Sequence, residues 1–176
     1  MTKSDLEQLI EKHGNDIYRF CFHLTGCRYD ADDLYQDTLC KAYEIRKRIE
    51  QTDDGPDLIK VRNYCLGIAV RLYKNSYRKR TRQAEESLDD GKNLQEPASE
   101  AMAEDLVEKK EMQAKVRNSI QALPLKQRTV IYLFYFADLP IKDISALLRI
   151  PAGTVKSRLN KAKSTLKNEL EEIWYA

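Results

Sequence analysis

Residues 141–159 read IKDISALLRIPAGTVKSRL, two short stretches of helical periodicity separated by a turn. Ile144 and Leu148 give the first stretch an apolar side, and Val155 and Leu159 do the same for the second. Ile150 lies between the two stretches, where an apolar side chain can fill the turn. This spacing predicts a helix-turn-helix, although an ordinary pair of packed helices would show the same periodicity.

Polar and basic side chains are left facing outward near the start of the second predicted helix. In helix-turn-helix proteins this end enters the major groove of DNA. Arg and Lys can pair with guanine edges, while Ser, Thr and Lys hold phosphates. The basic residues therefore favour DNA binding over a purely structural hairpin. The candidate contacts are Thr154, Lys156, Ser157, Arg158 and Lys161.

The rest of the chain also shows helical periodicity, and no strand pattern competes with it. The apolar stripe of residues 4–26 is interrupted near 13–15. Asp30 has the properties of an N-cap, with Asp33 in the capping-box position. Gly67 is expected to weaken or break the helix that contains it. We therefore predict an all-α fold, with helices over residues 4–26, 31–49, 58–81, 107–122, 125–137 (buried), 141–148 and 154–174.

The charged residues are distributed unevenly, although 30 Lys and Arg against 28 Asp and Glu give a formal net charge of only +2. Residues 60–82 carry eight basic side chains and no acidic one, with Tyr64, Tyr73 and Tyr77 between them. A run of this kind is either a solvated helix face or a surface for a polyanion. The interleaved aromatic residues favour nucleic acid.

Residues 83–105 form an acidic segment, with eight acidic side chains and a single basic one. They include few large apolar residues, so they cannot bury a core of their own. We predict a flexible acidic linker here. It separates two small helical domains, at residues 1–82 and 106–176.

The sequence shows no sign of catalysis or of a bound cofactor. The paired carboxylates Asp33 and Asp37 lack a third ligand, and Cys21, His23 and Cys27 fit no common zinc spacing. There is no nucleophile with a base partner and no phosphate-binding loop. We predict that the chain is not an enzyme and has no metal, no cofactor and no small-molecule substrate.

The composition indicates the cytoplasm. No apolar run approaches the length of a membrane span, and the first residues lack the features of a secretory signal. The four cysteines, which contain no CxxC pair, suggest reduced thiols, with Cys21 on an apolar helix face.

Two stretches resemble the bacterial sigma factors. Residues 123–170, LPLKQRTVIYLFYFADLPIKDISALLRIPAGTVKSRLNKAKSTLKNEL, resemble sigma domain 4, and residues 30–38, DADDLYQDT, resemble sigma domain 2. The order of the two, with only a linker between them, resembles the extracytoplasmic-function (ECF) group. The resemblance implies a promoter-specificity subunit whose partners are core RNA polymerase, promoter DNA and an anti-sigma factor that is often membrane-anchored.

The resemblance also implies three sets of contacts. The helix that starts at DADDLYQDT would dock on core polymerase through Asp32, Asp33, Leu34, Gln36, Asp37 and Thr38. The basic helix would melt and read the −10 element through Arg62, Asn63, Tyr64, Arg71, Lys74, Arg78 and Arg80. The helix-turn-helix would grip the −35 element through the five residues named above, with Arg149 in the turn as a phosphate contact.

Some positions depart from the family pattern. Tyr64 stands where the family usually has Trp, Gly67 where it has Arg, and Arg71 where many relatives have Asn, so the −10 preference is expected to differ. Arg149 occupies a turn position that is often a left-handed glycine, and that conformation costs an Arg about 1 kcal/mol. Ser145 replaces a small Ala and should be tolerated.

Three other functions fit part of the sequence. A free-standing helix-turn-helix regulator would explain residues 123–170 but not the basic helix or DADDLYQDT. An adaptor that binds a protein without touching DNA would not need Lys156 and Arg158. A carboxylate nuclease would require magnesium and Asp33.

Overall fold

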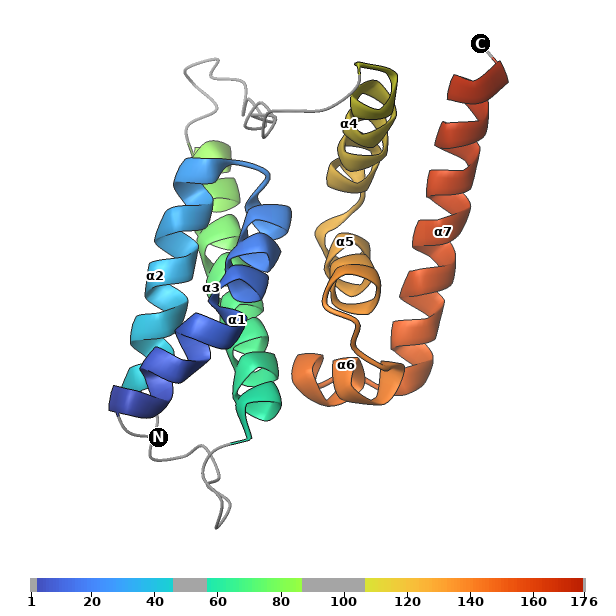
Figure 1. Ribbon diagram of the computed structural model, residues 1–176. Coiled ribbons are helices and arrows are strands. Elements are labelled where there is room, and N and C mark those ends of the chain that lie inside the picture. The colour runs from blue at the N-terminus through green and yellow to red at the C-terminus, as the bar shows by residue number, and fades with distance from the viewer. Residues whose placement is uncertain (1–2, 46–56, 87–106, 176) are drawn as a thin grey trace. The chain divides into compact units, whose positions relative to one another are not determined.

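The computed structural model describes residues 3–45, 57–86 and 107–175, and every regular element in them is helical (Figure 1). This confirms the predicted all-α fold. The chain divides into two compact units, Met1–Ala98 and Ser99–Ala176. No helix within the described ranges is both long and apolar enough to span a bilayer.

The N-terminal unit is built from three helices, α1 (Lys3–Thr25), α2 (Arg28–Glu44) and α3 (Leu58–Glu86). Each of them packs against the other two (Figure 1). Their shared core removes large apolar side chains from water, at about 1.5–3 kcal/mol for each one fully buried. Its members include Leu9, Ile17, Leu24, Val61 and Leu66.

Helix α1 runs without a break through Gly14, so the predicted interruption at residues 13–15 is wrong. The glycine serves close packing instead of a turn. A Cβ atom at position 14 would lie 3.0 Å from the hydroxyl oxygen of Tyr35. Gly14 therefore lets this tyrosine of α2 approach the backbone of α1, where its ring also meets Tyr18 edge-on at 5.6 Å.

Helix α2 begins earlier than predicted. Gly26 has a positive φ of 74° and turns the chain, so Cys27 becomes the N-cap, without a side-chain hydrogen bond. Asp30, the predicted N-cap, lies inside the first turn, where its charge still favours the positive end of the helix dipole. The helix ends at Glu44, and the predicted extension to residue 49 lies outside the described residues.

Helix α3 begins at Leu58 as predicted, because Asp57 caps it. The Oδ1 atom of Asp57 accepts hydrogen bonds from the backbone N–H groups of Ile59 at 3.0 Å and Lys60 at 3.2 Å. The helix continues unbroken through the buried Gly67 and ends at Glu86. It therefore extends past the predicted end into the first residues of the predicted linker, while residues 87–106 lie outside the described part.

The C-terminal unit consists of α4 (Val107–Ala122), α5 (Leu125–Ile131), the π-helix η2 (Tyr132–Phe136), α6 (Ile141–Leu148) and α7 (Ala152–Tyr175). Helices α4, α5 and α6 all contact α7. The core includes Val130, Leu133, Ile144, Val155, Leu159 and Ala162. The predicted bounds of α4 and α6 are confirmed.

The single buried helix predicted for residues 125–137 is wrong in its second half. After Ile131 the backbone widens into η2, and Ala137 N–H donates to the carbonyl of Tyr132, five residues back, at 2.9 Å. Tyr132 and Leu133 remain buried, but Tyr135 and Phe136 are about half exposed, at 53% and 50%. Helical periodicity alone does not reveal this widening, because it moves the last aromatic residues off the expected face.

Candidate nucleic-acid interface

The helix-turn-helix predicted from residues 141–159 is present. Helices α6 and α7 are joined by a short turn in which Arg149 adopts the left-handed conformation, with φ 54° and ψ 49°. Ile144 of α6 and Val155 and Leu159 of α7 are buried, as the sequence predicts. A left-handed Arg is unfavourable by about 1 kcal/mol, so the surrounding turn must hold it in place.

The turn is closed by Ser145. Its Oγ donates to the carbonyl oxygen of Ile150 at 2.6 Å, and the N–H of Ile150 donates back to the carbonyl of Ser145 at 3.1 Å. Two hydrogen bonds thus span the strained Arg149. The sequence suggested only that Ser145 would be tolerated, so this stabilising role was missed. A hydroxyl-bearing residue four positions before the turn residue Arg149 was the available signal.

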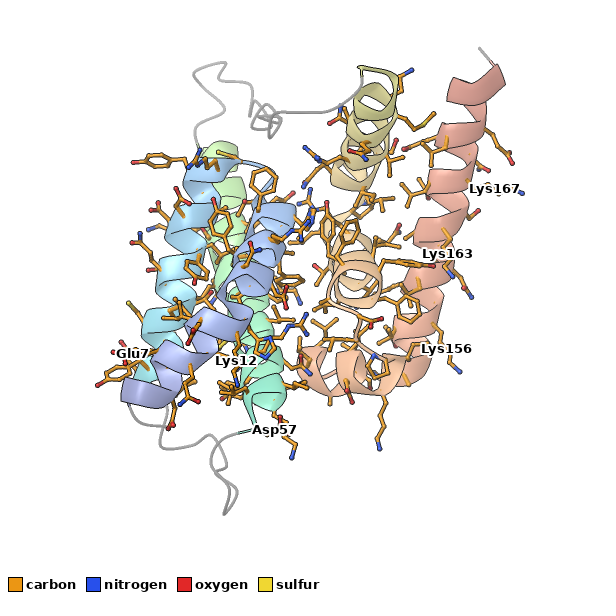
Figure 2. The ribbon with its side chains drawn as sticks, viewed as in Figure 1. Glu7, Lys12, Asp57, Lys156, Lys163 and Lys167 are labelled. Carbon is orange, nitrogen blue, oxygen red and sulfur yellow. The ribbon has the colours of Figure 1, made fainter. Side chains whose placement is uncertain are left out.

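The candidate −35 contacts lie on the outer side of this motif. Lys156, Ser157, Lys161 and Arg149 are exposed, whereas Thr154 and Arg158 are half-buried. Figure 2 shows Lys156, Lys163 and Lys167 extending away from α7. Further along the helix, the Lys163 ammonium lies 5.6 Å from the ring centroid of Tyr135, a cation–π contact. The second helix therefore presents a positive face next to an exposed aromatic ring.

The basic run of α3 is mostly accessible. Tyr64, Arg71 and Arg78 are exposed, Lys74 is half-buried, and the rings of Tyr73 and Tyr77 lie 6.2 Å apart. Arg80 belongs to the helix, but its side chain lies outside the described part. Along its accessible length α3 combines cations with aromatic rings, the pattern of a single-strand binding surface.

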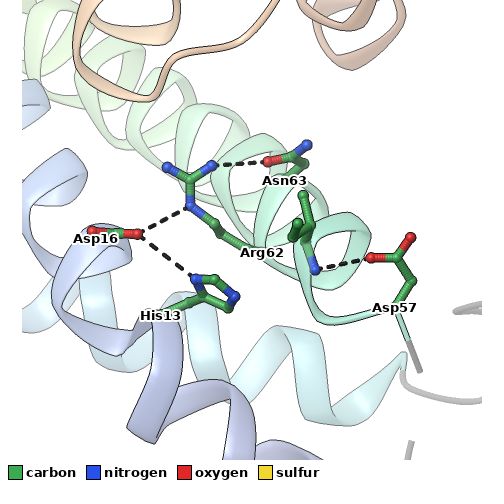
Figure 3. Close-up of polar contacts among 6 residues, drawn as sticks. His13, Asp16, Asp57, Arg62 and Asn63 are labelled. Carbon is green, nitrogen blue, oxygen red and sulfur yellow. Dashed lines mark hydrogen bonds and ion pairs between the residues drawn. The ribbon is translucent and has the colours of Figure 1, made fainter. Parts of the chain in front are cut away.

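Arg62 differs from the other predicted −10 contacts. Its side chain is only 14% exposed, and its Nε atom lies 3.5 Å from Oδ2 of Asp16 on α1 (Figure 3). Its Nη1 atom donates to Oδ1 of the neighbouring Asn63 at 3.2 Å. The guanidinium is therefore engaged inside the unit, and a direct contact with DNA phosphate would require this ion pair to open. The sequence did not indicate that Asp16 is its partner.

The predicted polymerase-docking residues of α2 fall into two groups, one exposed and one buried. Asp32, Asp33, Gln36 and Asp37 are exposed. Leu34 is only 7% exposed and Thr38 is 0% exposed, with its Oγ1 donating to the carbonyl of Leu34 at 2.6 Å. The side chains of Leu34 and Thr38 therefore lie in the core of the unit, while the other four predicted residues lie on its surface.

Tyr18 joins α1 to this acidic side. Partial burial raises the pKa of its phenol, and a hydrogen bond with Asp32 raises it further. Tyr18 therefore stays a neutral phenol at physiological pH. Position 18 was not among the sequence candidates, and a tyrosine beside an apolar stripe gave only a weak signal.

Two thiols lie inside the N-terminal unit. Cys21 and Cys65 are buried, as the sequence predicted for Cys21, and burial raises the pKa of each to about 12. Both therefore remain protonated and unreactive as nucleophiles. Within the described ranges, no three His, Cys, Asp or Glu residues gather where they could hold a metal ion.

Two family models match the chain. The model described as Sigma-70 region 2 matches residues 9–83, and the one described as Sigma-70, region 4 matches residues 113–166. The first covers most of the three-helix unit and the second includes the whole helix-turn-helix.

Relatives match over most of the chain. It is 28% identical over 171 residues to the ECF RNA polymerase sigma factor SigW of Bacillus subtilis (strain 168), covering 94% of this chain and 88% of the relative. It is 30% identical over 147 residues to the ECF RNA polymerase sigma factor EcfG of Rhodopseudomonas palustris (strain TIE-1), covering 84% and 75%.

A solved structure has a similar fold. It is the sigma factor RpoE in complex with the anti-sigma factor NepR from Bartonella quintana. The TM-score is 0.77 at 23% identity, covering 95% of this chain and 97% of the other.

Proposed function

This chain belongs to the ECF group of sigma-70 family RNA polymerase sigma factors, and we propose from this that it binds core RNA polymerase and directs it to specific promoters. One observation carries the proposal. A basic, tyrosine-bearing helix in one unit and a helix-turn-helix in the other occur in a single chain. A protein with both surfaces can hold an opened strand and a duplex at the same time.

The −35 element is read by α7 in this proposal. The exposed Lys156, Ser157 and Lys161, with the half-buried Thr154 and Arg158, would reach base edges and phosphates in the major groove. Arg149 would contact a phosphate from the turn. The positive charge of these side chains gives affinity, and hydrogen bonds to base edges give specificity.

The −10 element is opened on α3 in this proposal. The exposed Arg71 and Arg78, with Lys74, would bind the backbone of the unpaired strand, and Tyr64 would offer a stacking face. Unstacking a base costs a few kcal/mol, which such stacking and hydrogen bonding can offset. Arg80 is a further proposed phosphate contact.

Core polymerase docks on the exposed side of α2 in this proposal, through Asp32, Asp33, Gln36 and Asp37. The negative charge of this side suits a basic partner and would speed association. Leu34 and Thr38 act from behind, by fixing α2 against the rest of the unit.

An anti-sigma factor is proposed as a further partner, since the similar RpoE is solved in complex with NepR. Its anchoring in a membrane is expected from the family alone. We further propose that the chain works in the cytoplasm and is not itself an enzyme, because the polymerase supplies the chemistry.

The test is reconstitution with purified core polymerase. The wild-type chain is expected to form a holoenzyme that gives promoter-specific run-off transcripts. Asp33→Lys/Asp37→Lys should weaken core binding at least tenfold, because it reverses the charge of the docking side. The matched control is Glu7→Lys/Glu11→Lys, which reverses two exposed acids at the same spacing on α1.

Two results would contradict the proposal. Equal weakening by both double variants would mean that net charge and not the α2 surface controls docking. A chain that binds bare duplex but never core polymerase would be a free-standing regulator.

A further inference from the structure

Tyr29 lies in the first turn of α2 and is the most exposed large hydrophobic side chain of the described residues, at 77%. Exposed apolar side chains are common on protein surfaces, so exposure alone assigns no role to this ring. Its position on the helix is more informative. Asp32 and Asp33 follow it by three and four residues and Gln36 by seven, which places all of them on one face of α2. Tyr29 therefore extends the proposed docking side toward the start of the helix.

The backbone that carries Tyr29 is fixed by the turn between α1 and α2. Gly26 is buried and turns the chain with a φ of 74°. The hydroxyl oxygen of the buried Thr25 lies 3.0 Å from the carbonyl oxygen of Cys21 and 3.1 Å from that of Cys27. Because the start of α2 is held against the end of α1, a partner that binds Tyr29 loses little free energy in ordering this backbone.

The surroundings of Tyr29 are acidic. Residues 28–37 carry four Asp residues and a single Arg. A partner that complements this charge is itself basic and brings Arg or Lys side chains to the docking side. The face of a tyrosine ring attracts such a cation within about 6 Å of the ring centroid. The C-terminal unit contains a contact of this kind, where Lys163 lies 5.6 Å from the ring centroid of Tyr135. An exposed ring among acids thus suits a cationic side chain of the partner.

We propose that Tyr29 is an aromatic anchor of the docking side, and that its ring binds an arginine or lysine side chain of core polymerase through a cation–π contact. This inference rests on the proposed function. The ring and the acids of α2 then act on different rate constants. Charge attraction acts before contact and raises the association rate, whereas a ring that is covered in the complex slows dissociation. Tyrosine is enriched among the few residues that dominate the affinity of protein interfaces.

The experiment measures both rate constants with the full chain in solution and core polymerase immobilised on a sensor surface. Tyr29→Ala should raise the dissociation rate constant about tenfold and change the association rate constant by less than about twofold. Asp33→Lys/Asp37→Lys should mainly lower the association rate constant, because it reverses two charges. Ile59→Ala is the matched control, since it truncates another exposed apolar side chain, at 61%, and it should dissociate as wild type.

Two further substitutions of Tyr29 separate a cation–π contact from apolar packing. Tyr29→Phe keeps the ring face without the hydroxyl and should dissociate within about threefold of the wild-type rate. Tyr29→Leu keeps an apolar side chain without a π face and should dissociate about fivefold faster than wild type. Because the side chain of Tyr29 is largely exposed, both variants should unfold at the urea midpoint of wild type.

The outcomes distinguish this inference from the proposed function. If wild type binds core polymerase and Tyr29→Ala or Tyr29→Leu dissociates no faster, the inference is overturned and the proposed function stands. An equal increase in dissociation for Ile59→Ala would likewise overturn the anchor, because loss of any exposed apolar group would then have the same effect. Failure of the wild-type chain to bind core polymerase would overturn both proposals.

Discussion

The hydroxyl of Ser145 donates to the carbonyl of Ile150 at 2.6 Å and so closes the turn of the helix-turn-helix around Arg149. Ser145→Ala removes this bond and should lower the free energy of unfolding of the C-terminal unit by about 1 kcal/mol. Urea denaturation of the wild type and the variant measures the difference. Ser164→Ala, at an exposed position of α7, is the control, and an equal loss there would show that the hydrogen bond is not the cause.

Replacing the left-handed Arg149 should have opposite effects on stability and binding. Arg149→Gly relieves the backbone strain and should raise the free energy of unfolding by about 1 kcal/mol. It also removes a cation and should weaken holoenzyme binding to the selected promoter duplex. Arg149→Lys keeps the charge and should bind nearly as wild type. Unchanged binding by Arg149→Gly would remove Arg149 from the proposed phosphate contacts.

Lys156 lies in the proposed groove-facing half of α7, and Lys167 lies three turns further along the same helix. Lys156→Ala should weaken duplex binding and make the slope of log affinity against log salt shallower by about 1. Lys167→Ala removes an equal charge outside the motif, where its pair with Glu171 at 3.5 Å is exposed and contributes little. Identical salt slopes for both variants would argue against groove binding by this face.

We expect the buried thiols to make the N-terminal unit less stable at alkaline pH. Burial raises the pKa of Cys21 and Cys65 from 9.0 to about 12 in the folded state. The two thiols therefore lose their protons at a lower pH in the unfolded state than in the folded state. The stabilising contribution is complete below about pH 9 and is lost as the pH rises toward 12. Urea midpoints of the wild type should therefore fall over that range.

The double variant Cys21→Ala/Cys65→Ala isolates the thiol contribution. Its urea midpoints should fall less steeply over the same pH range. A smaller fall should remain, because burial also raises the pKa of Tyr35. Parallel curves for the two proteins would mean that the thiols do not cause the alkaline loss.

The α-helices could be predicted from the sequence, because apolar spacing and the Pro124 boundary are local signals. The start of α3 and the bounds of α4 and α6 follow from such signals. Gly14 shows the limit of this reasoning. A glycine inside a helix has the same local pattern whether it breaks the helix or admits a partner, and only the position of Tyr35 distinguishes the two.

The candidate site was predictable where exposure follows from helical phase, as for Lys156 and Lys161. The exposure of a side chain was not predictable where its contacts come from another helix. Arg62 looked like one more cation of a basic run, and its ion pair with Asp16 joins residues 46 positions apart. The helical periodicity of the sequence likewise did not indicate the π-helical widening at Tyr132–Phe136.

The exposed thiol of Cys40 gives the molecule an attachment point for a spectroscopic probe. It lies one turn beyond Gln36 and Asp37 on α2, the proposed docking side. Cys21 and Cys65 are shielded, and Cys27 is half-buried, so replacing Cys27 with Ser would leave a single readily labelled cysteine. A maleimide fluorophore at Cys40 would then change its emission when polymerase covers this side, and docking could be followed in real time without engineering a new cysteine.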